Sequence, residues 1–445
     1  MIYIDRSIYI QQILLGKRKK TKLIYNNRIL YRDNIAKRSY LCLQHQQLGN
    51  ESHDLKGTTA NESKSKPASQ PAAATGNGVK KPPNGTFKLA LFGAVLGAVT
   101  GSVYTVYSRW TDIDSHKEHE HTPPKRVENM PAGVRITKRY VNPKDTSGLD
   151  IVLFQFQTCP FCCKVRAYLD YMGVSYSVVE VDAVLRQDIR WSVLKKVPMV
   201  LLRQRDGDGQ YVQMVDSSAI ISLIATYLHD KRTDILELAE FYPHISFFDD
   251  ESKKKTDILN KYFVMYQDRA PKNVTKETEE IERKWRSWAD DHLVHLISPN
   301  CYQSMEESLE TFEWFSKAGE WDVHFPKWER NLMVYCGAVA MWGIAKMLKR
   351  RHALTDDVRS HMYDALDKWT TELKKRNTKF MGGKQPSLAD LSVFGVLSSM
   401  EGCQTFKDCL QNTSIGKWFY DVKEIVEKNR GQLHRERIEG VVLPA

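Results

Sequence analysis

Residues 150–230 alternate short apolar runs of strand length with segments in which apolar residues recur at helical spacing. The turn Asp206-Gly207-Asp208-Gly209 is a strong hairpin signal between two of these runs. The predicted strands are Ile151–Phe156, Tyr176–Asp182, Met199–Arg203 and Tyr211–Val215. The predicted helices are Cys163–Met172, Val184–Leu194 and Ala219–Leu228. The order βαβαββα predicts a small α/β domain.

Beyond His229 the apolar residues recur at helical spacing alone. The predicted helices are Lys276–Ile297, Leu332–Arg350, Asp356–Lys375, Ala389–Leu397 and Ile415–Lys428. Ser387-Leu388-Ala389-Asp390 has the form of a capping box at the start of one of them. Tryptophans recur in this part of the chain, and we interpret them as core residues. An all-α domain is therefore expected to follow the α/β domain.

The N-terminal part has a different pattern. Residues 1–50 are basic and acid-poor, which is typical of a mitochondrial presequence or a basic tail, and residues 50–84 have the composition of a linker. Phe87–Tyr107 has one charge, Lys88, and is just long enough to cross a bilayer. The predicted parts are a basic, largely disordered region 1–86, a candidate transmembrane helix 87–107, a linker 108–148, an α/β domain 149–229, a connecting segment 230–275 and a helical domain 276–435.

Charge and cysteine content exclude two classes of protein. The net charge is +11, but residues 1–81 hold 15 basic and 5 acidic residues, so the rest of the chain is nearly neutral. A phosphate-binding face would need that excess on the folded region, so we expect no nucleic-acid partner. Eight cysteines in 445 residues are too sparse for a secreted disulfide framework.

Thr158-Cys159-Pro160-Phe161-Cys162 follows the first predicted strand and begins the first predicted helix. Unpaired N–H groups and the positive end of the helix dipole would favour a thiolate at Cys159. Cys162 lies one turn further on, where it could resolve a mixed disulfide. A Cys-Pro-x-Cys turn in this order of elements predicts a thioredoxin-like domain with a reactive thiol.

Three blocks of the α/β region resemble the glutaredoxin-like half of the glutathione-transferase superfamily. They are 154–166, Lys195–Met199 and Val215–Ile221. A closer likeness is to the type-two, membrane-associated prostaglandin E synthases of that superfamily. This likeness rests on Thr158–Cys162, Lys195–Pro198, Asp216–Ser218, Trp288–Asp291, Leu293–Asn300 and Phe380–Gly383. The resemblance covers about residues 150–430 and implies a helical transferase-like C-terminal domain.

The resemblance also implies a glutathione site. Pro198 is expected to be cis and to bring a strand end beside Cys159, so that the backbone of Val197 could pair with a bound peptide. Asp216 and Ser217 would hold the γ-glutamyl group at a helix start. Phe161 would lie against the peptide. Family members are expected to have a tyrosine where this chain has Phe156, so a hydroxyl that could bond the thiol is absent here.

A further candidate site lies on the predicted helix Lys276–Ile297 and just beyond it. His292 and His295 share one helical face, with Ser298 one turn on. The resemblance places this segment at the cleft between domains, where it associates haem with the fold. We therefore keep haem as a second candidate cofactor beside glutathione, with exposed or satisfied histidines as the alternative. No dedicated metal site is predicted.

The resemblance implies an isomerase that converts prostaglandin H2 into prostaglandin E2 through the Cys159 thiolate. A glutaredoxin-like dithiol oxidoreductase, a glutathione- or haem-binding module with little catalysis, and a conjugating transferase are the alternatives. The expected partners are glutathione, a prostaglandin endoperoxide lipid, a membrane through residues 87–107 and a second copy in a homodimer. The expected location is a mitochondrial membrane; the alternative is a Golgi membrane with a cytoplasmic processed form.

Overall fold

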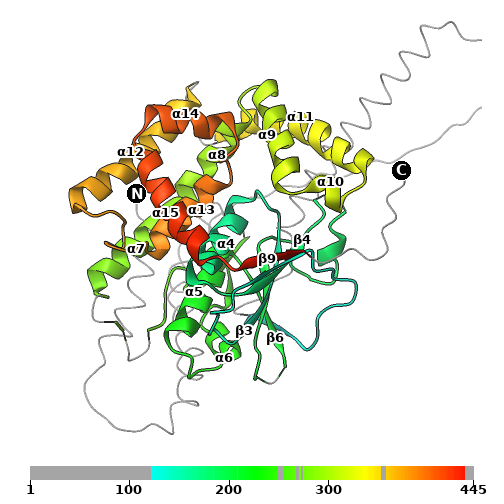
Figure 1. Cartoon of the computed structure of the whole chain (residues 1–445), viewed down its shortest axis with the longest axis vertical. Coiled ribbons are helices and arrows are strands. Elements are labelled where there is room, and N and C mark those ends of the chain that lie inside the picture. The colour runs from blue at the N-terminus through cyan, green and yellow to red at the C-terminus, as the bar shows by residue number, and fades with distance from the viewer. Residues whose placement is uncertain are drawn as a thin grey trace, which may run out of the picture. The chain divides into compact units, whose positions relative to one another are not determined.

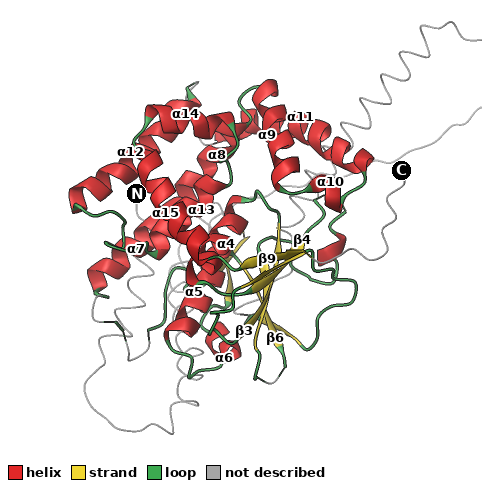
Figure 2. Ribbon diagram, in the orientation of Figure 1, coloured by secondary structure: helices red, strands yellow, loops and turns green. Residues whose placement is uncertain are grey.

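The computed structural model describes residues 122–435, apart from 184, 208, 249–253, 267–269, 272–273 and 352–356. The predicted N-terminal region 1–86 and the candidate transmembrane helix 87–107 lie outside the described residues. In the described part, a mixed β-sheet comes first in the sequence, and a large group of helices follows it and packs beside it (Figures 1 and 2). The predicted fold class, an α/β region followed by an all-α region, is confirmed.

The sheet is built around apolar strands whose residues are buried on both faces. Seven strands run in the order β1-β6-β5-β3-β4-β2-β9, with β3 parallel to β4 and antiparallel to β5. The strands are β1 (Lys125–Val127), β2 (Lys138–Val141), β3 (Leu149–Gln155), β4 (Tyr176–Glu180), β5 (Met199–Gln204), β6 (Tyr211–Val215) and β9 (Gln432–Arg435). All four strands expected from apolar runs are present. The short polar strands β1, β2 and β9 extend the sheet at its edges, and β1 and β2 lie in the stretch interpreted as a linker.

Two helices of the α/β region match the sequence pattern and one does not. α4 (Pro160–Met172) and α5 (Ser217–His229) are the predicted first and third helices. The predicted helix Val184–Leu194 is wrong, because this segment contains a single 3₁₀ turn, Gln187–Ile189. Its apolar side chains do not share a buried face: Ile189 is buried, whereas Val193 is 59% exposed. Trp191 packs its ring against Phe154 of the sheet.

The connecting segment 230–275 contains little regular secondary structure. It contains α6 (Ile235–Ala239) and a two-stranded hairpin, β7 (His244–Phe248) and β8 (Lys254–Ile258). α6 packs beside β5 and β6. The residues after β8, Lys261 and Tyr262, reach the N-terminal end of α5, so the connection contributes to the candidate site described below.

The helical region confirms the five helices expected from periodicity, with one interruption. The helix expected over Lys276–Ile297 is α7 (Lys276–Trp288) and α8 (Val294–Cys301), joined by a π-helical turn, η2 (Ala289–Leu293). α11 (Lys327–Arg351), α12 (Val358–Arg376), α13 (Leu388–Ser398) and α15 (Ile415–Asn429) are the other four. The pattern did not reveal α9 (Met305–Ala318), α10 (Trp321–His324) or α14 (Gln404–Asn412).

α4 and α13 form the central contact between the two regions, as Figure 1 shows. Gly395 lies where α13 crosses α4, and a Cβ atom there would stand 2.5 Å from the Cα of Lys164. The predicted capping box is present at the start of α13, since Ser387 and Asp390 bond each other's backbone N–H groups. Asp390 also accepts hydrogen bonds from the Trp418 indole and the Met381 backbone, so α13 and α15 are fixed together.

Candidate functional site

Cys159 is the residue that caps the N-terminus of α4, directly after β3. Pro160 occupies the first helical position, where its missing N–H costs nothing, and the Cys159 side chain makes no capping hydrogen bond of its own. Cys159 as a residue is half-buried. Its position at a helix start agrees with the sequence expectation.

The pKa of the Cys159 thiol is lowered, chiefly by a hydrogen bond from the Cys162 thiol. The backbone N–H groups of Cys162 and Phe161 and the positive charge of Arg166 act in the same direction, against the effect of burial. Cys162 is fully buried, and burial raises the pKa of its thiol well above the usual range. Cys162 therefore stays protonated and donates to a Cys159 thiolate. The sequence argument identified the helix start but missed the larger contribution of the neighbouring thiol.

Val197 and Pro198 lie at the start of β5, the strand that pairs with β3 ahead of α4. The peptide bond between them is cis. Met199, the next residue, pairs with Phe154 of β3 on one side and with Val215 of β6 on the other. Val197 is half-buried and precedes this ladder.

Asp216 and Ser217 stand at the N-terminus of α5. Asp216 has φ +70° and accepts hydrogen bonds from the N–H groups of Ser218 and Ala219, so it is the helix cap. Burial raises the pKa of Asp216, and Lys261 opposes this shift from 4.0 Å. The Ser217 hydroxyl is buried and accepts a hydrogen bond from Lys164 at 3.1 Å.

A buried ion pair joins α4, α5 and η2 behind these groups. Lys164 is fully buried, and its ammonium contacts Asp290 of η2 while bonding the Ser218 hydroxyl at 2.9 Å. Asp290 also accepts from Ser218 at 2.7 Å and from Tyr262 at 3.2 Å. Lys164 lowers the pKa of Asp290 despite its burial. One carboxylate of the helical region thus fixes the two helix starts that carry Cys159 and Asp216.

Sequence reasoning missed Lys164, Lys261 and Tyr262. The motif Trp288-Ala289-Asp290-Asp291 was noted as part of a resemblance, without a role for Asp290. The signal that could have indicated it is Lys164 itself, which lies between Cys163 and Val165 on the apolar side of the predicted helix, because a buried lysine needs a partner. The sequence pattern cannot say where along the chain that partner lies.

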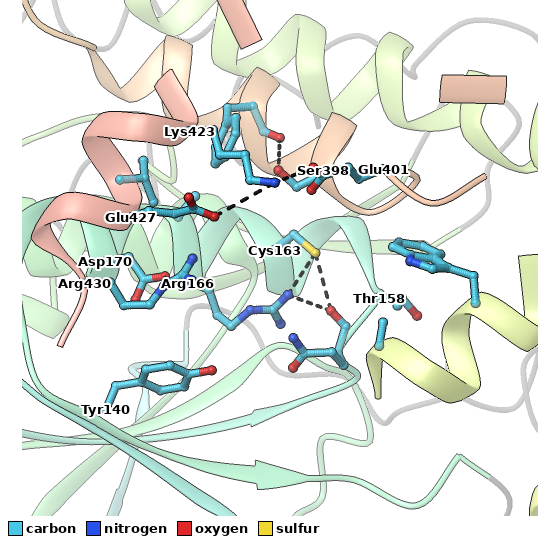
Figure 3. A pocket seen from close by; sticks show the side chains of 16 residues that line it. Tyr140, Thr158, Cys163, Arg166, Asp170, Ser398, Glu401, Lys423, Glu427 and Arg430 are labelled. Atoms are coloured by element: carbon cyan, nitrogen blue, oxygen red, sulfur yellow. Dashed lines mark hydrogen bonds and ion pairs between the residues drawn. The ribbon is translucent and has the colours of Figure 1, made fainter. Parts of the chain in front are cut away.

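A cavity of about 230 Å³, lined by both charged and apolar side chains, lies on the opposite flank of α4. Figure 3 shows Cys163 and Arg166 facing it from α4, with Glu401, Lys423 and Glu427 opposite. The Cys163 thiol donates to the Gln157 carbonyl oxygen, and burial raises its pKa. Trp314, Phe394 and Val426 line this cavity together with the charged groups.

The residues proposed for haem do not form a ligand set. Among residues 122–435, outside the gaps named above, no group of three His, Cys, Asp or Glu side chains could hold a metal ion. His292 and His295 are exposed, and the His292 ring lies 5.8 Å from the ring of Trp288. Burial, Lys368 and His361 lower the pKa of His292. Ser298 is half-buried, and nothing in the described part of the chain supports the expected haem site.

Comparison with known proteins adds to this geometry. A family model described as Glutaredoxin matches residues 151–205. Prostaglandin E synthase 2 of Danio rerio is 43% identical over 281 residues, which are 62% of this chain and 72% of that protein. Prostaglandin E synthase 2 of Mus musculus is 38% identical over 335 residues, which are 75% of this chain and 80% of that protein. The resemblance inferred from the motifs is confirmed, and so is the expectation of an enzyme.

The chain also resembles solved glutathione transferases. The structure of glutathione S-transferase III in apo form aligns with 66% of this chain and 99% of its own, at 14% identity and a TM-score of 0.36.

Proposed function

The chain belongs to the prostaglandin E synthase 2 family, and we propose that it isomerises prostaglandin H2 to prostaglandin E2 at the Cys159 thiolate. The observation that carries this proposal is the position of Cys159 at the N-terminus of α4, where the neighbouring Cys162 thiol and the backbone N–H groups of Cys162 and Phe161 lower the pKa of its thiol. A thiolate is the form of cysteine that attacks an electrophile.

The proposed reaction needs a nucleophile that is later expelled. The Cys159 thiolate attacks one endoperoxide oxygen, so that an S–O bond forms, the O–O bond breaks, and the second oxygen leaves as an alkoxide that takes up a proton. A base then removes the hydrogen from the carbon that bears the sulfur-bound oxygen. The C–H electron pair forms the ketone, the S–O bond breaks and the thiolate is restored. Substrate and product are isomers, and no external oxidant or reductant is consumed.

Glutathione is the proposed cofactor, and three groups of this chain fit it. Asp216 presents a carboxylate for the α-ammonium group, and the Ser217 N–H and hydroxyl lie at a helix start suited to a carboxylate. Val197, which precedes β5 and is joined to Pro198 by a cis peptide bond, would pair its backbone with the peptide. Phe161, half-buried in the first turn of α4, would border the peptide. When bound there, glutathione supplies a second thiol close to Cys159.

A dithiol oxidoreductase is the second candidate function, because Cys159 and Cys162 are in contact and the surrounding segment matches a glutaredoxin model. In that reaction the Cys159 thiolate attacks a substrate disulfide and releases one thiol, and Cys162 then attacks the Cys159 sulfur, which expels the second thiol and leaves a Cys159–Cys162 disulfide. The two reactions make different demands on residue 162, since the isomerase needs a hydrogen-bond donor there and the oxidoreductase needs sulfur.

The proposal is tested with the full chain and its Cys159→Ser and Cys162→Ser variants. Prostaglandin E2 formation and glutathione-disulfide reduction are measured on each protein. We expect Cys159→Ser to reduce both activities to background. Cys162→Ser, which retains a donor, should keep prostaglandin formation and lose disulfide reduction. Normal prostaglandin formation by Cys159→Ser would refute the proposed mechanism.

The membrane anchor, a homodimer and a mitochondrial or Golgi location belong to the same proposal. They rest on the composition of residues 1–107 and on the resemblance. Within the described part of the chain, Lys327–Arg350 is one helix long and apolar enough to cross a membrane, although 22% of its most apolar window is buried in the protein. This helix was not the segment expected to do so.

A further inference from the structure

α11 has an exposed apolar face that the fold does not cover. Its buried face, with Met333, Val334 and Ala338, packs against α8 and α9. On the opposite face, four large apolar side chains follow one another at helical spacing and are 43–66% exposed. They are Trp328, Leu332, Tyr335 and Val339. Figure 1 shows α11 with α9 and α10 at the margin of the helical region.

The composition of α11 makes this face unusual for a surface helix. The segment 332–345 reads LMVYCGAVAMWGIA and contains no charged residue. A helix that is apolar all round is normally covered on every side. Val323 of α10, 53% exposed, and Met347 of α11, 44% exposed, are two further exposed apolar side chains of these helices. Half of the twelve strongly exposed large apolar side chains in the described part of the chain therefore lie on α10 and α11.

The charges at the ends of α11 indicate what covers it. Six residues of α11 are Lys or Arg, at 327, 330, 346, 349, 350 and 351, whereas Glu329 is its one acidic residue. Glu329 is 7% exposed, and the exposed Asp322 of α10 pairs with Arg330 at 2.9 Å, so the positive charge of α11 is concentrated at its C-terminal end, where four of the six basic residues lie. The folded region as a whole is nearly neutral. This excess is therefore a local feature of the apolar helix.

We propose that the exposed face of α11 lies on an anionic lipid bilayer, parallel to its surface. Apolar side chains of Trp328, Leu332 and Val339 would enter the acyl boundary, while the lysines and arginines at the helix ends meet phosphate groups. Tryptophan and tyrosine suit this depth because each has an apolar body and a polar edge. A symmetric contact between two α11 helices would instead bring two cationic surfaces together.

This surface differs from the candidate membrane segment at 87–107 and is independent of the reaction proposed for Cys159. It would hold the folded region against the surface in which lipid substrates partition. Because α8 and α9 occupy its other face, α11 would lie on the bilayer and not cross it.

A fluorescent label on Cys336 tests the contact directly. Cys336 is exposed on α11. The full chain with Cys42→Ser and Cys159→Ser is labelled with nitrobenzoxadiazole and mixed with phosphatidylcholine vesicles that contain or lack phosphatidylserine. We expect a blue-shifted, brighter emission and quenching by spin-labelled lipid with the anionic vesicles alone. Emission typical of water, with the protein bound to those vesicles, would overturn the proposal.

A matched pair of variants separates lipid from a second copy. Leu332 and Leu433 are 43% and 42% exposed. Leu332→Glu should reduce the fraction of Cys336 label that enters anionic vesicles about tenfold, as the loss of one buried leucine predicts, and Leu433→Glu should not. If Leu332→Glu instead converts a dimer into a monomer in light scattering and leaves the label signal unchanged, a second copy covers α11 and the proposal is wrong.

Discussion

At the scale of the residue, the reactivity of Cys159 depends on a donor that is itself buried. Cys162 keeps its proton because burial raises the pKa of its thiol, and that proton stabilises the thiolate of Cys159. The absence of a tyrosine hydroxyl at Phe156 therefore does not leave Cys159 without support.

Replacement of Cys162 by alanine should raise the pKa of Cys159, because the largest stabilising hydrogen bond is lost. The thiolate fraction rises with pH through the pKa, so the pH profile of Cys159 alkylation by iodoacetamide should move to higher pH. Cys162→Ser, which keeps an O–H donor, should move the profile less. The alkylated cysteine is identified by mass spectrometry. Identical profiles for wild type and Cys162→Ala would show that the helix N–H groups suffice.

Asp290 stabilises the fold mainly through its charge, because it is the counter-ion of the buried Lys164 ammonium. Asp290→Asn keeps the shape and can still bond Ser218 and Tyr262, but it leaves the Lys164 ammonium buried without a counter-charge. We expect a loss of about 3 kcal/mol of unfolding free energy. Lys164→Met in the same chain should recover much of it. The free energies are measured by urea denaturation, and an unchanged midpoint for Asp290→Asn would contradict the assigned role.

At the scale of the element, the crossing of α4 and α13 is set by Gly395. An added Cβ would lie 2.5 Å and 2.6 Å from backbone atoms of Lys164, which cannot rotate away. Gly395→Ala should therefore destabilise the protein by about 1–3 kcal/mol. Gly343→Ala, also within a helix but with no atom within 4 Å of the new Cβ, is the matched control and should be neutral or stabilising. Equal melting temperatures for the two variants would show that α13 can shift.

The elements that could be predicted are those marked by a short apolar run or by apolar residues at helical spacing. The strand Tyr211–Val215 is buried throughout, the helix Ile415–Asn429 buries residues at helical spacing, and the sequence places the bounds of both within a few residues. The edge strands β1 and β9, KRV and QLHR, have no apolar period because pairing, not burial, holds them. The helix predicted over Val184–Leu194 is absent, because the apolar residues of this segment do not share one buried face.

In the candidate site, too, some residues could be located from the sequence and others could not. Cys159, Pro198 and Asp216 could be located because each stands at an element boundary that local sequence marks. Lys164 and Asp290 are 126 positions apart, and their contact follows from how α4 and η2 pack, which no local pattern encodes. The π-helical turn that carries Asp290 is likewise invisible to an argument based on a helical period.

At the scale of the whole molecule, the last described strand, β9, joins the β-sheet of the α/β region. β9 pairs with β2, and Arg430 donates to the buried carboxylate of Asp170 at 2.6 Å. Asn429 donates to the carbonyl oxygen of Tyr171. Together with the contacts of α4 with α13, these bonds indicate that the sheet and helical regions unfold as one unit.

Arg430→Gln tests this coupling. Burial raises the pKa of Asp170 and Arg430 opposes the shift, so loss of the cation should raise that pKa further and leave β9 less firmly held. In hydrogen–deuterium exchange, wild-type peptides from β3–β5 and α12–α15 should share one slow opening rate. Arg430→Gln should speed exchange in both groups, because one cooperative unit has been weakened, while Lys428→Gln, at an exposed position in the last turn of α15, should change neither. Faster exchange in β2 and β9 alone would show that the closure is local, and that the two regions are held together by the α4–α13 contact without it.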